Sequence, residues 1–158
     1  MTSNSVSVFG SYNTNSHYIL TSPAANTYHP ISGNVVIVTT VPDTKVVVTG
    51  QALTTFTANV YNISPGQPYQ ELDTTTGILI TSSTGTYTVS NVTIYQVAYS
   101  IGPAAFDNSF YETGITLNLP TPDTYTFRLY VYWPQNVDFQ VSQTDSQDRR
   151  LLAQSFKR

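Results

Sequence analysis

The two histidines are the first residues to consider for catalysis. His17 and His29 lie in an N-terminal stretch rich in Ser, Thr and Asn. Their spacing matches no zinc-binding pattern. The chain also has no Gly-x-Ser-x-Gly motif that would place a nucleophilic serine beside a histidine. Because there is no cysteine, the sequence excludes disulfides, thiolate zinc sites and cysteine nucleophiles. We therefore predict that the protein is not an enzyme.

The carboxylates are the other candidates for chemistry. Glu71 with Asp73, and Asp107 with Glu112, are the pairs that could act as the two acids of a glycoside hydrolase. No apolar neighbours surround the first pair to raise the pKa of one acid, so turn-capping or solvated acids are the favoured interpretation. Asp73, Asp107 and Asp123 could supply oxygen ligands to calcium from separate loops. No spacing supports such a site, and we predict no cofactor.

The composition predicts pleated backbone. The chain contains 25 Thr, 16 Ser, 16 Val and 12 Tyr, and only 9% of its residues are charged, against about 25% in ordinary soluble domains. This mixture favours strands over helices. The net charge of −3 offers no attraction for nucleic acid or anionic lipid. No apolar run could span a bilayer, and the N-terminus carries no pattern of a secretory signal, so we predict no membrane partner.

Eight candidate strands follow one another at nearly regular intervals, separated by Gly, Pro, Asp and Ser. They are residues 34–41, 45–49, 53–61, 77–82, 86–99, 113–119, 124–133 and 137–142. Among the expected breaks are Gly50-Gln51, Ser83-Thr84-Gly85 and Pro120-Thr121-Pro122-Asp123. Eight antiparallel strands of this length predict a two-sheet β-sandwich of jelly-roll type.

The segment 124–133 alternates most clearly. One face carries Tyr125, Phe127, Leu129, Val131 and Trp133, and the other carries Thr126, Arg128, Tyr130 and Tyr132. The first face is predicted to be core. Two neighbouring tyrosines on a nominally exposed face indicate contact with something, and we predict that Tyr130 and Tyr132 belong to a subunit interface.

The segment 86–99 has apolar residues on both faces, because Val92 and Ile94 have the opposite parity to Tyr87, Val89 and Tyr95. Two interpretations stay open. A β-bulge near Asn91 would switch the inward parity. Alternatively, the outer face packs against a sister subunit through Val92 and Ile94.

The two ends differ from the middle. Residues 1–30 are predicted to be a Ser/Thr/Asn-rich arm, residues 31–143 the jelly-roll domain, and residues 144–158 a polar-to-basic tail or short helix. The candidate tail contacts to a neighbour are Arg149, Arg150, Leu151, Leu152 and Phe156. A frayed, solvated tail is the alternative.

Residues 56–89 resemble the globular heads of the complement recognition subcomponent and, more distantly, tumour necrosis factor. Phe56, Asn62, Tyr69, Leu79 and the run Gly85-Thr86-Tyr87-Thr88-Val89 carry the resemblance. Pro122-Asp123-Thr124-Tyr125 is similar to the turn before a late core strand. The resemblance implies a ten-strand jelly roll assembled as a trimer, in which the strand after the Gly-x-Tyr motif lies near the threefold axis.

These observations predict a non-enzymatic structural protein that assembles with copies of itself. A neutral, hydroxyl-rich chain without an export signal suits a virion component, either capsid, vertex or spike, whose partners are copies of the chain or other virion proteins. The alternative is a secreted or surface recognition module, lectin-like or receptor-binding, with its ligand site in loops. Exposed Tyr and Asn could hold a sugar ring by stacking and hydrogen bonding.

Overall fold

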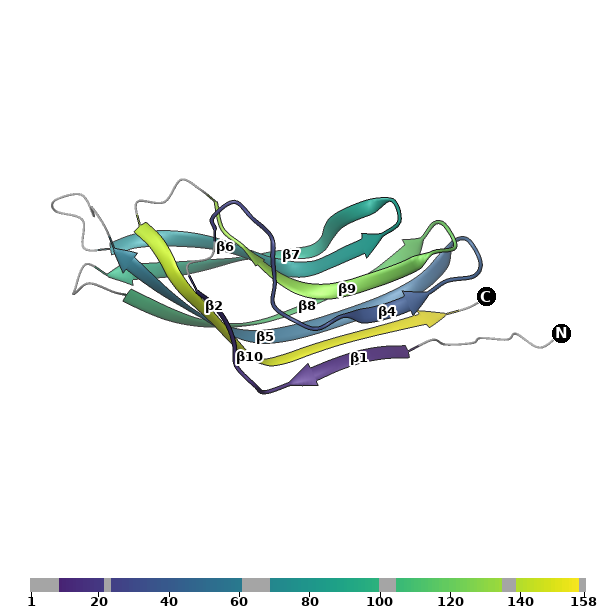
Figure 1. Cartoon of the computed structure of the whole chain (residues 1–158), viewed down its shortest axis with the longest axis horizontal. Coiled ribbons are helices and arrows are strands. Elements are labelled where there is room, and N and C mark those ends of the chain that lie inside the picture. Colours follow the sequence, from purple (N-terminus) through teal and green to yellow (C-terminus); the bar gives the residue numbers. More distant parts are fainter. Residues whose placement is uncertain (1–8, 22–23, 61–68, 100–104, 135–138, 157–158) are drawn as a thin grey trace.

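The computed structural model describes residues 9–21, 24–60, 69–99, 105–134 and 139–156, and these residues form β-strands and no helix. The strands are β1 Phe9–Thr14, β2 Tyr18–Thr21, β3 His29–Pro30, β4 Val35–Val38, β5 Thr44–Val60, β6 Tyr69–Ser82, β7 Gly85–Tyr99, β8 Ala105–Leu119, β9 Thr124–Tyr132 and β10 Phe139–Phe156. They make two antiparallel sheets that form a sandwich (Figure 1). The all-β prediction is confirmed.

Sheet A has the order β1-β10-β5-β8, with β2 also paired to β10. Sheet B has the order β3-β9-β6-β7, with β4 also paired to β9. The sheets meet where β7 passes β8, because Ser90 Oγ donates to the Gly114 carbonyl at 2.9 Å and accepts from the Gly114 amide at 3.1 Å. At the opposite edge β1 passes close to β4: a Cβ on Gly10 would lie only 2.7 Å from Val35 Cγ1. The sandwich is thus joined at both long edges.

The core lies between the sheets and comes from the inward face of each strand. Its largest fully buried side chains include Ile31, Ile37, Ile78, Ile80, Leu119, Phe127, Leu129, Trp133 and Leu151. All five residues assigned to the inward face of 124–133 are buried. Period-two alternation therefore predicted the core face of β9 correctly.

The strand pairing shows that the predictions of an N-terminal arm and of a C-terminal tail or short helix were wrong for the described residues. Within residues 1–30, β1 and β2 pair with β10, and β3 pairs with β9, so the described part of this segment belongs to the sandwich. Residues 144–158 are neither a tail nor a helix as far as Phe156, because β10 lies between β1 and β5 in sheet A. The acid-to-base gradient of the segment was compatible with a helix, but the neighbouring strands supply partners for an extended backbone.

The predicted break at Gly50 is also wrong. Residues 45–49 and 53–61 were expected as separate strands, whereas β5 runs without interruption from Thr44 to Val60. A Cβ on Gly50 would lie 2.6 Å from Leu129 Cδ2. Gly50 therefore serves a close approach between the two sheets rather than a turn.

Candidate functional site: the outer faces of the two sheets

Tyr130 does not form the exposed surface that its position predicted. Its side chain is fully buried, although it points to the outer face of sheet B. The Tyr130 hydroxyl donates to Asn91 Oδ1 at 2.5 Å, and the edge of its ring meets Tyr28 with centroids 5.3 Å apart. Burial raises the pKa of Tyr130 to about 12, and a hydrogen bond with Thr88 acts in the opposite direction. Tyr130 is therefore a structural residue of the monomer.

Tyr28 covers the position where a partner subunit was expected. Its ring stacks on Tyr132 with centroids 4.8 Å apart, and the Tyr132 hydroxyl hydrogen-bonds Asn26 Oδ1. Tyr132 is half-buried, whereas Tyr28 is 50% exposed. Tyr28 is thus an exposed aromatic side chain of this face, and the sequence did not predict it as a contact residue. Its only signal was an aromatic residue in a Ser/Thr/Asn-rich stretch.

The structure decides between the two interpretations of segment 86–99 in favour of a bulge. The β6–β7 register shifts between Thr76 and Ile78, and Ser90 has a positive φ of 52°. Beyond the shift, Val92 pairs with Thr76, whose side chain is fully buried. Paired residues in antiparallel strands share a face, so Val92 faces sheet A and is not an outer contact. Ile94 pairs with Thr74, but its side chain lies outside the described residues.

The candidate contact residues at the C-terminus divide by parity along β10. Arg149 and Leu151 are buried, while Arg150, Leu152 and Phe156 are exposed on the outer face of sheet A. An extended strand sends alternate side chains to opposite faces. Only the three exposed residues of this set remain candidates for contact with another molecule.

Arg149 holds the N-terminal strands against the sandwich. Its Nη1 donates to the Ile31 carbonyl at 2.5 Å and its Nη2 to the Ser16 carbonyl at 2.9 Å. The guanidinium also lies 5.1 Å from the ring centre of Tyr18 and 5.8 Å from that of Tyr12. Two carbonyls and two aromatic faces compensate for the burial of this charge.

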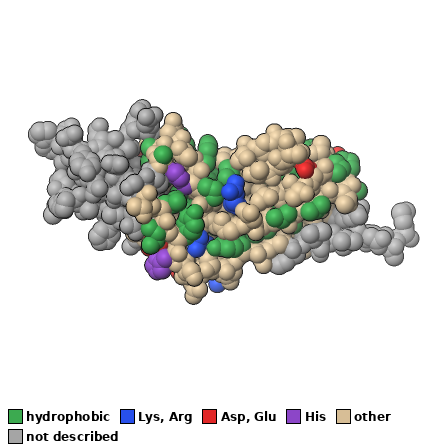
Figure 2. All heavy atoms as spheres, viewed as in Figure 1, with side chains coloured by type: hydrophobic (Ala, Val, Ile, Leu, Met, Phe, Trp, Pro, Cys, Tyr) green, Lys and Arg blue, Asp and Glu red, His purple; other side chains and the backbone are tan. Residues whose placement is uncertain are grey.

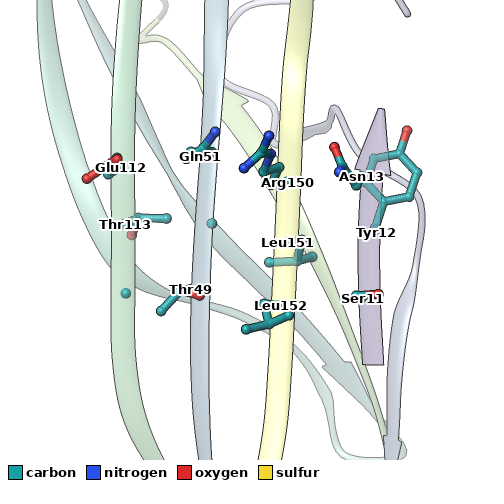
Figure 3. A pocket seen from close by; sticks show the side chains of 12 residues that line it. Ser11, Tyr12, Asn13, Thr49, Gln51, Glu112, Thr113, Arg150, Leu151 and Leu152 are labelled. Atoms are coloured by element: carbon teal, nitrogen blue, oxygen red, sulfur yellow. The ribbon is translucent and has the colours of Figure 1, made fainter. Parts of the chain in front are cut away.

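The outer face of sheet A is hollowed across four adjacent strands. The depression has a volume of about 710 Å³, and two rows of paired residues define it (Figure 3). The polar row consists of Asn13, Arg150, Gln51 and Glu112, and the floor row consists of Ser11, Leu152, Thr49 and Gly114. A smaller hollow of about 360 Å³ continues beyond the polar row, lined also by Asn15 and Asp148.

Two local features bend the sheet and leave this face open. The β10–β5 register shifts between Gln147 and Arg150, and Asp148 has a positive φ of 50°. A bulge of this kind bends its strand and increases the local twist. In the floor row, Gly114 contributes no side chain to fill the space on β8. The sequence predicted Arg150 and Leu152 as contact residues but not this site, because its residues come from strands that only the tertiary fold brings together.

Asp123 and the two histidines, which were among the candidates for chemistry, have structural partners. Asp123 accepts hydrogen bonds from the Ser83 amide at 3.0 Å and the Thr124 amide at 2.7 Å. These bonds, together with that from the Ser83 hydroxyl, lower the pKa of Asp123. His17 Nδ1 lies 2.7 Å from Asp145 Oδ2, and the His29 ring stacks on Trp133.

No group of three or more metal-ligating side chains occurs within the described ranges. The side chains of Glu71 and Asp107, two of the acids considered above, lie outside the described residues.

The described chain is thus an all-β, two-sheet sandwich with its open surfaces on the outer faces. No protein-family model matches the sequence, and no curated protein matches it. Among solved structures, it is similar to a chain in the structure of infectious bursal disease virus Gx strain, with 12% sequence identity and a TM-score of 0.47. The similarity covers 95% of this chain and 32% of that chain, so this chain spans about a third of the length of the other.

Proposed function

We propose that the protein is a non-enzymatic jelly-roll module that assembles with copies of itself, most simply as a trimer, and serves as a structural component of a virus particle. The proposal keeps the assembly role predicted from composition. It moves the contact surface from Tyr130 and Tyr132 to side chains that are exposed in the monomer.

The order of the strands supports the jelly-roll assignment. If β1 with β2, and β3 with β4, are each counted as one interrupted strand, the first strand pairs with the last in sequence and the second with the next to last. The pairing continues inward through β5 with β8 to β6 with β7. Such nested pairing is what results when a long hairpin wraps into two sheets of four strands.

The observation that carries the assembly proposal is the group of exposed apolar side chains on the outer face of sheet B. Val36 and Val38 on β4 are 43% and 54% exposed, and Tyr28 is 50% exposed at the other end of this face. In the view of Figure 2, charged side chains of the described residues are few, and hydrophobic ones lie among uncharged polar ones. On β9, the half-buried Arg128 lies between these positions. Exposed apolar groups with so few charges among them are typical of a surface that contacts protein.

The mass of the native complex tests the proposal. Sedimentation and light scattering over a wide concentration range should give a threefold mass at high concentration. The double variant Val36→Thr/Val38→Thr keeps β-branched side chains in β4 and should move the assembly midpoint to roughly tenfold or more higher concentration. The matched control is Val47→Thr, which makes the same change on the outer face of sheet A. A chain that stays monomeric at every concentration would refute the proposal.

A second candidate function is a surface or secreted recognition module, lectin-like or receptor-binding. The depression on the outer face of sheet A favours it, because ligand sites are concave and combine a few polar groups with apolar walls. Saturable binding of a glycan by the purified chain would support this candidate. If no glycan binds in the same assay, the recognition candidate is refuted and the assembly role remains.

A further inference from the structure

We infer that the depression on the outer face of sheet A is a binding site for a neutral oligosaccharide. This inference deepens the recognition candidate above, but it does not depend on the assembly role. A particle subunit and a free recognition module could equally carry the site, because the apolar surface proposed for assembly lies on the opposite sheet.

The polar row offers hydrogen-bonding groups that the protein itself leaves unused. In the part of the chain that the structure describes, the side chains of Asn13, Arg150, Gln51 and Glu112 have no hydrogen-bond or ion-pair partner. Each neighbouring pair in the row is in direct register, and Figure 3 shows all four side chains at one level across the sheet. Three inter-strand spacings make the row roughly 14 Å long.

The chemistry of the row complements a series of hydroxyl groups. A carboxylate only accepts hydrogen bonds, a guanidinium only donates them, and the two amides do both. A sugar hydroxyl is simultaneously donor and acceptor, so vicinal hydroxyls can satisfy each of these groups. Glu112 and Arg150 stand on strands separated by β5, which leaves their charged groups available to a ligand rather than to each other.

The floor row suits the less polar side of a sugar ring. Leu152 is 37% exposed, and the Thr49 methyl group lies toward Gly114, where an added Cβ would be 3.4 Å from Thr49 Cγ2. Burying the C–H groups of a ring against Leu152 and the Thr49 methyl removes apolar surface of both partners from water.

The charge of the site selects among glycans. Among the described residues that line the two hollows are one guanidinium, from Arg150, and two carboxylates, from Glu112 and Asp148. The surroundings are therefore slightly negative, which disfavours glycans that carry carboxylate or sulfate groups. A neutral ligand has no such penalty.

The hollow shape argues against a twofold contact between two copies at this face. Two identical concave faces brought together would leave an unfilled space between them, and such a space forfeits packing energy. The volume of about 710 Å³ lies instead within the usual range of small-molecule sites, about 300–1,000 Å³.

A glycan array containing neutral and acidic oligosaccharides, probed with the full chain, tests the inference. We expect saturable binding to neutral members, followed by measurement of Kd for the best one. Glu112→Gln and Arg150→Gln should each weaken binding by roughly tenfold to a hundredfold, as expected for loss of a charge-assisted hydrogen bond. Thr49→Tyr should abolish binding by filling the depression, while its strand propensity preserves β5.

The matched control is Asn118→Ala, an exposed polar position on the outer face of β8 away from the depression. It should bind as the wild type does, and thermal melting should confirm that all four variants are folded. Absence of binding to neutral glycans, binding to acidic glycans alone, or unchanged binding by Thr49→Tyr would each overturn the inference. The native mass is measured in parallel, so that failure of glycan binding is distinguished from failure of assembly.

Discussion

At the scale of single residues, Arg149 joins distant parts of the chain. It reaches the Ser16 and Ile31 carbonyls from the middle of β10 and lies beside the Tyr18 ring. Because the side chain is buried, no water can easily replace these contacts. The residue therefore fixes the N-terminal segment whose strands complete sheet A.

We predict that Arg149→Ala lowers the free energy of unfolding by about 3 kcal/mol, because it removes hydrogen bonds from buried carbonyls and leaves a cavity. Arg149→Lys should lie between this variant and the wild type, because an ammonium group cannot reach both carbonyls with the same geometry. Urea denaturation measures the difference. The control is the adjacent but exposed Arg150→Ala, expected within about 0.5 kcal/mol of the wild type. Equal effects at both positions would contradict the structural role of Arg149.

Asp123 predicts a pH dependence at the same scale. Hydrogen bonds from Ser83 and Thr124 lower its pKa in the folded protein. A lowered folded-state pKa contributes stability above the unfolded-state pKa of about 4, and this contribution is lost as the pH falls through the lowered value. Asp123→Asn should therefore be less stable than the wild type near pH 7, and the difference should shrink as the pH falls below about 4. Urea unfolding across this range measures the difference.

The control for that experiment is Asn118→Ala, an exposed position on β8 without an ionisable group. The stability difference between this variant and the wild type should not change with pH. If the free energy of unfolding of Asp123→Asn differs from that of the wild type by the same amount from neutral to acidic pH, the Asp123 carboxylate does not stabilise the turn as proposed.

At the scale of elements, the bulge in β7 links the two sheets. It turns Ser90 toward β8, where the hydroxyl binds both backbone groups of Gly114, and the Thr113 hydroxyl donates to the Ser90 carbonyl at 2.6 Å. On β6, a Cβ added to Gly77 would lie 2.8 Å from the Ser90 carbonyl oxygen. Gly77 therefore makes room for the bulge, and the bulge supplies the contact between the sheets.

We predict that Ser90→Ala destabilises the fold by about 2 kcal/mol through loss of these hydrogen bonds. Ser90→Gly removes the same hydroxyl but relieves the positive φ, and should cost about 1 kcal/mol. Chemical denaturation of both variants measures the two contributions separately. If Ser90→Gly lowers the free energy of unfolding more than Ser90→Ala does, backbone strain at Ser90 does not contribute as proposed.

At the scale of the whole molecule, the proposed assembly should depend on apolar contact more than on charge. Only 9% of the residues are charged, and the net charge is −3. The exposed side chains proposed for contact are Val36, Val38 and Tyr28. Burial of such groups is weakened by cooling and strengthened by sulfate, whereas screening of charges acts through ionic strength.

We therefore predict that the assembly midpoint changes by less than about threefold when sodium chloride is raised from about 0.1 M to about 1 M, where the screening length falls from about 10 Å to about 3 Å. Sodium sulfate at matched ionic strength should promote assembly, and cooling should weaken it. Sedimentation at several temperatures provides the measurement. Dissociation of the complex by sodium chloride alone would indicate an electrostatic interface instead.

The sequence by itself determined that the chain is all-β and which face of β9 is core. Both follow from local properties, namely strand propensity and the alternation of side chains along one strand. The sequence also shows apolar residues on both faces of segment 86–99. It does not distinguish a bulge near Asn91 from a subunit interface.

Only the tertiary structure decided which outward side chains are exposed and where the chain ends belong. The alternation along β9 places Tyr130 on the outer face, but Tyr28 covers its side chain. From residue 144 onward acidic residues precede basic ones, an order that also suits a helix. In the structure, pairing with β1 and β5 makes this segment a strand as far as Phe156. The four strands of the polar row become neighbours only in the folded sheet. In each case the deciding contacts join residues far apart in the chain, and their free energy exists only once the sheets have formed.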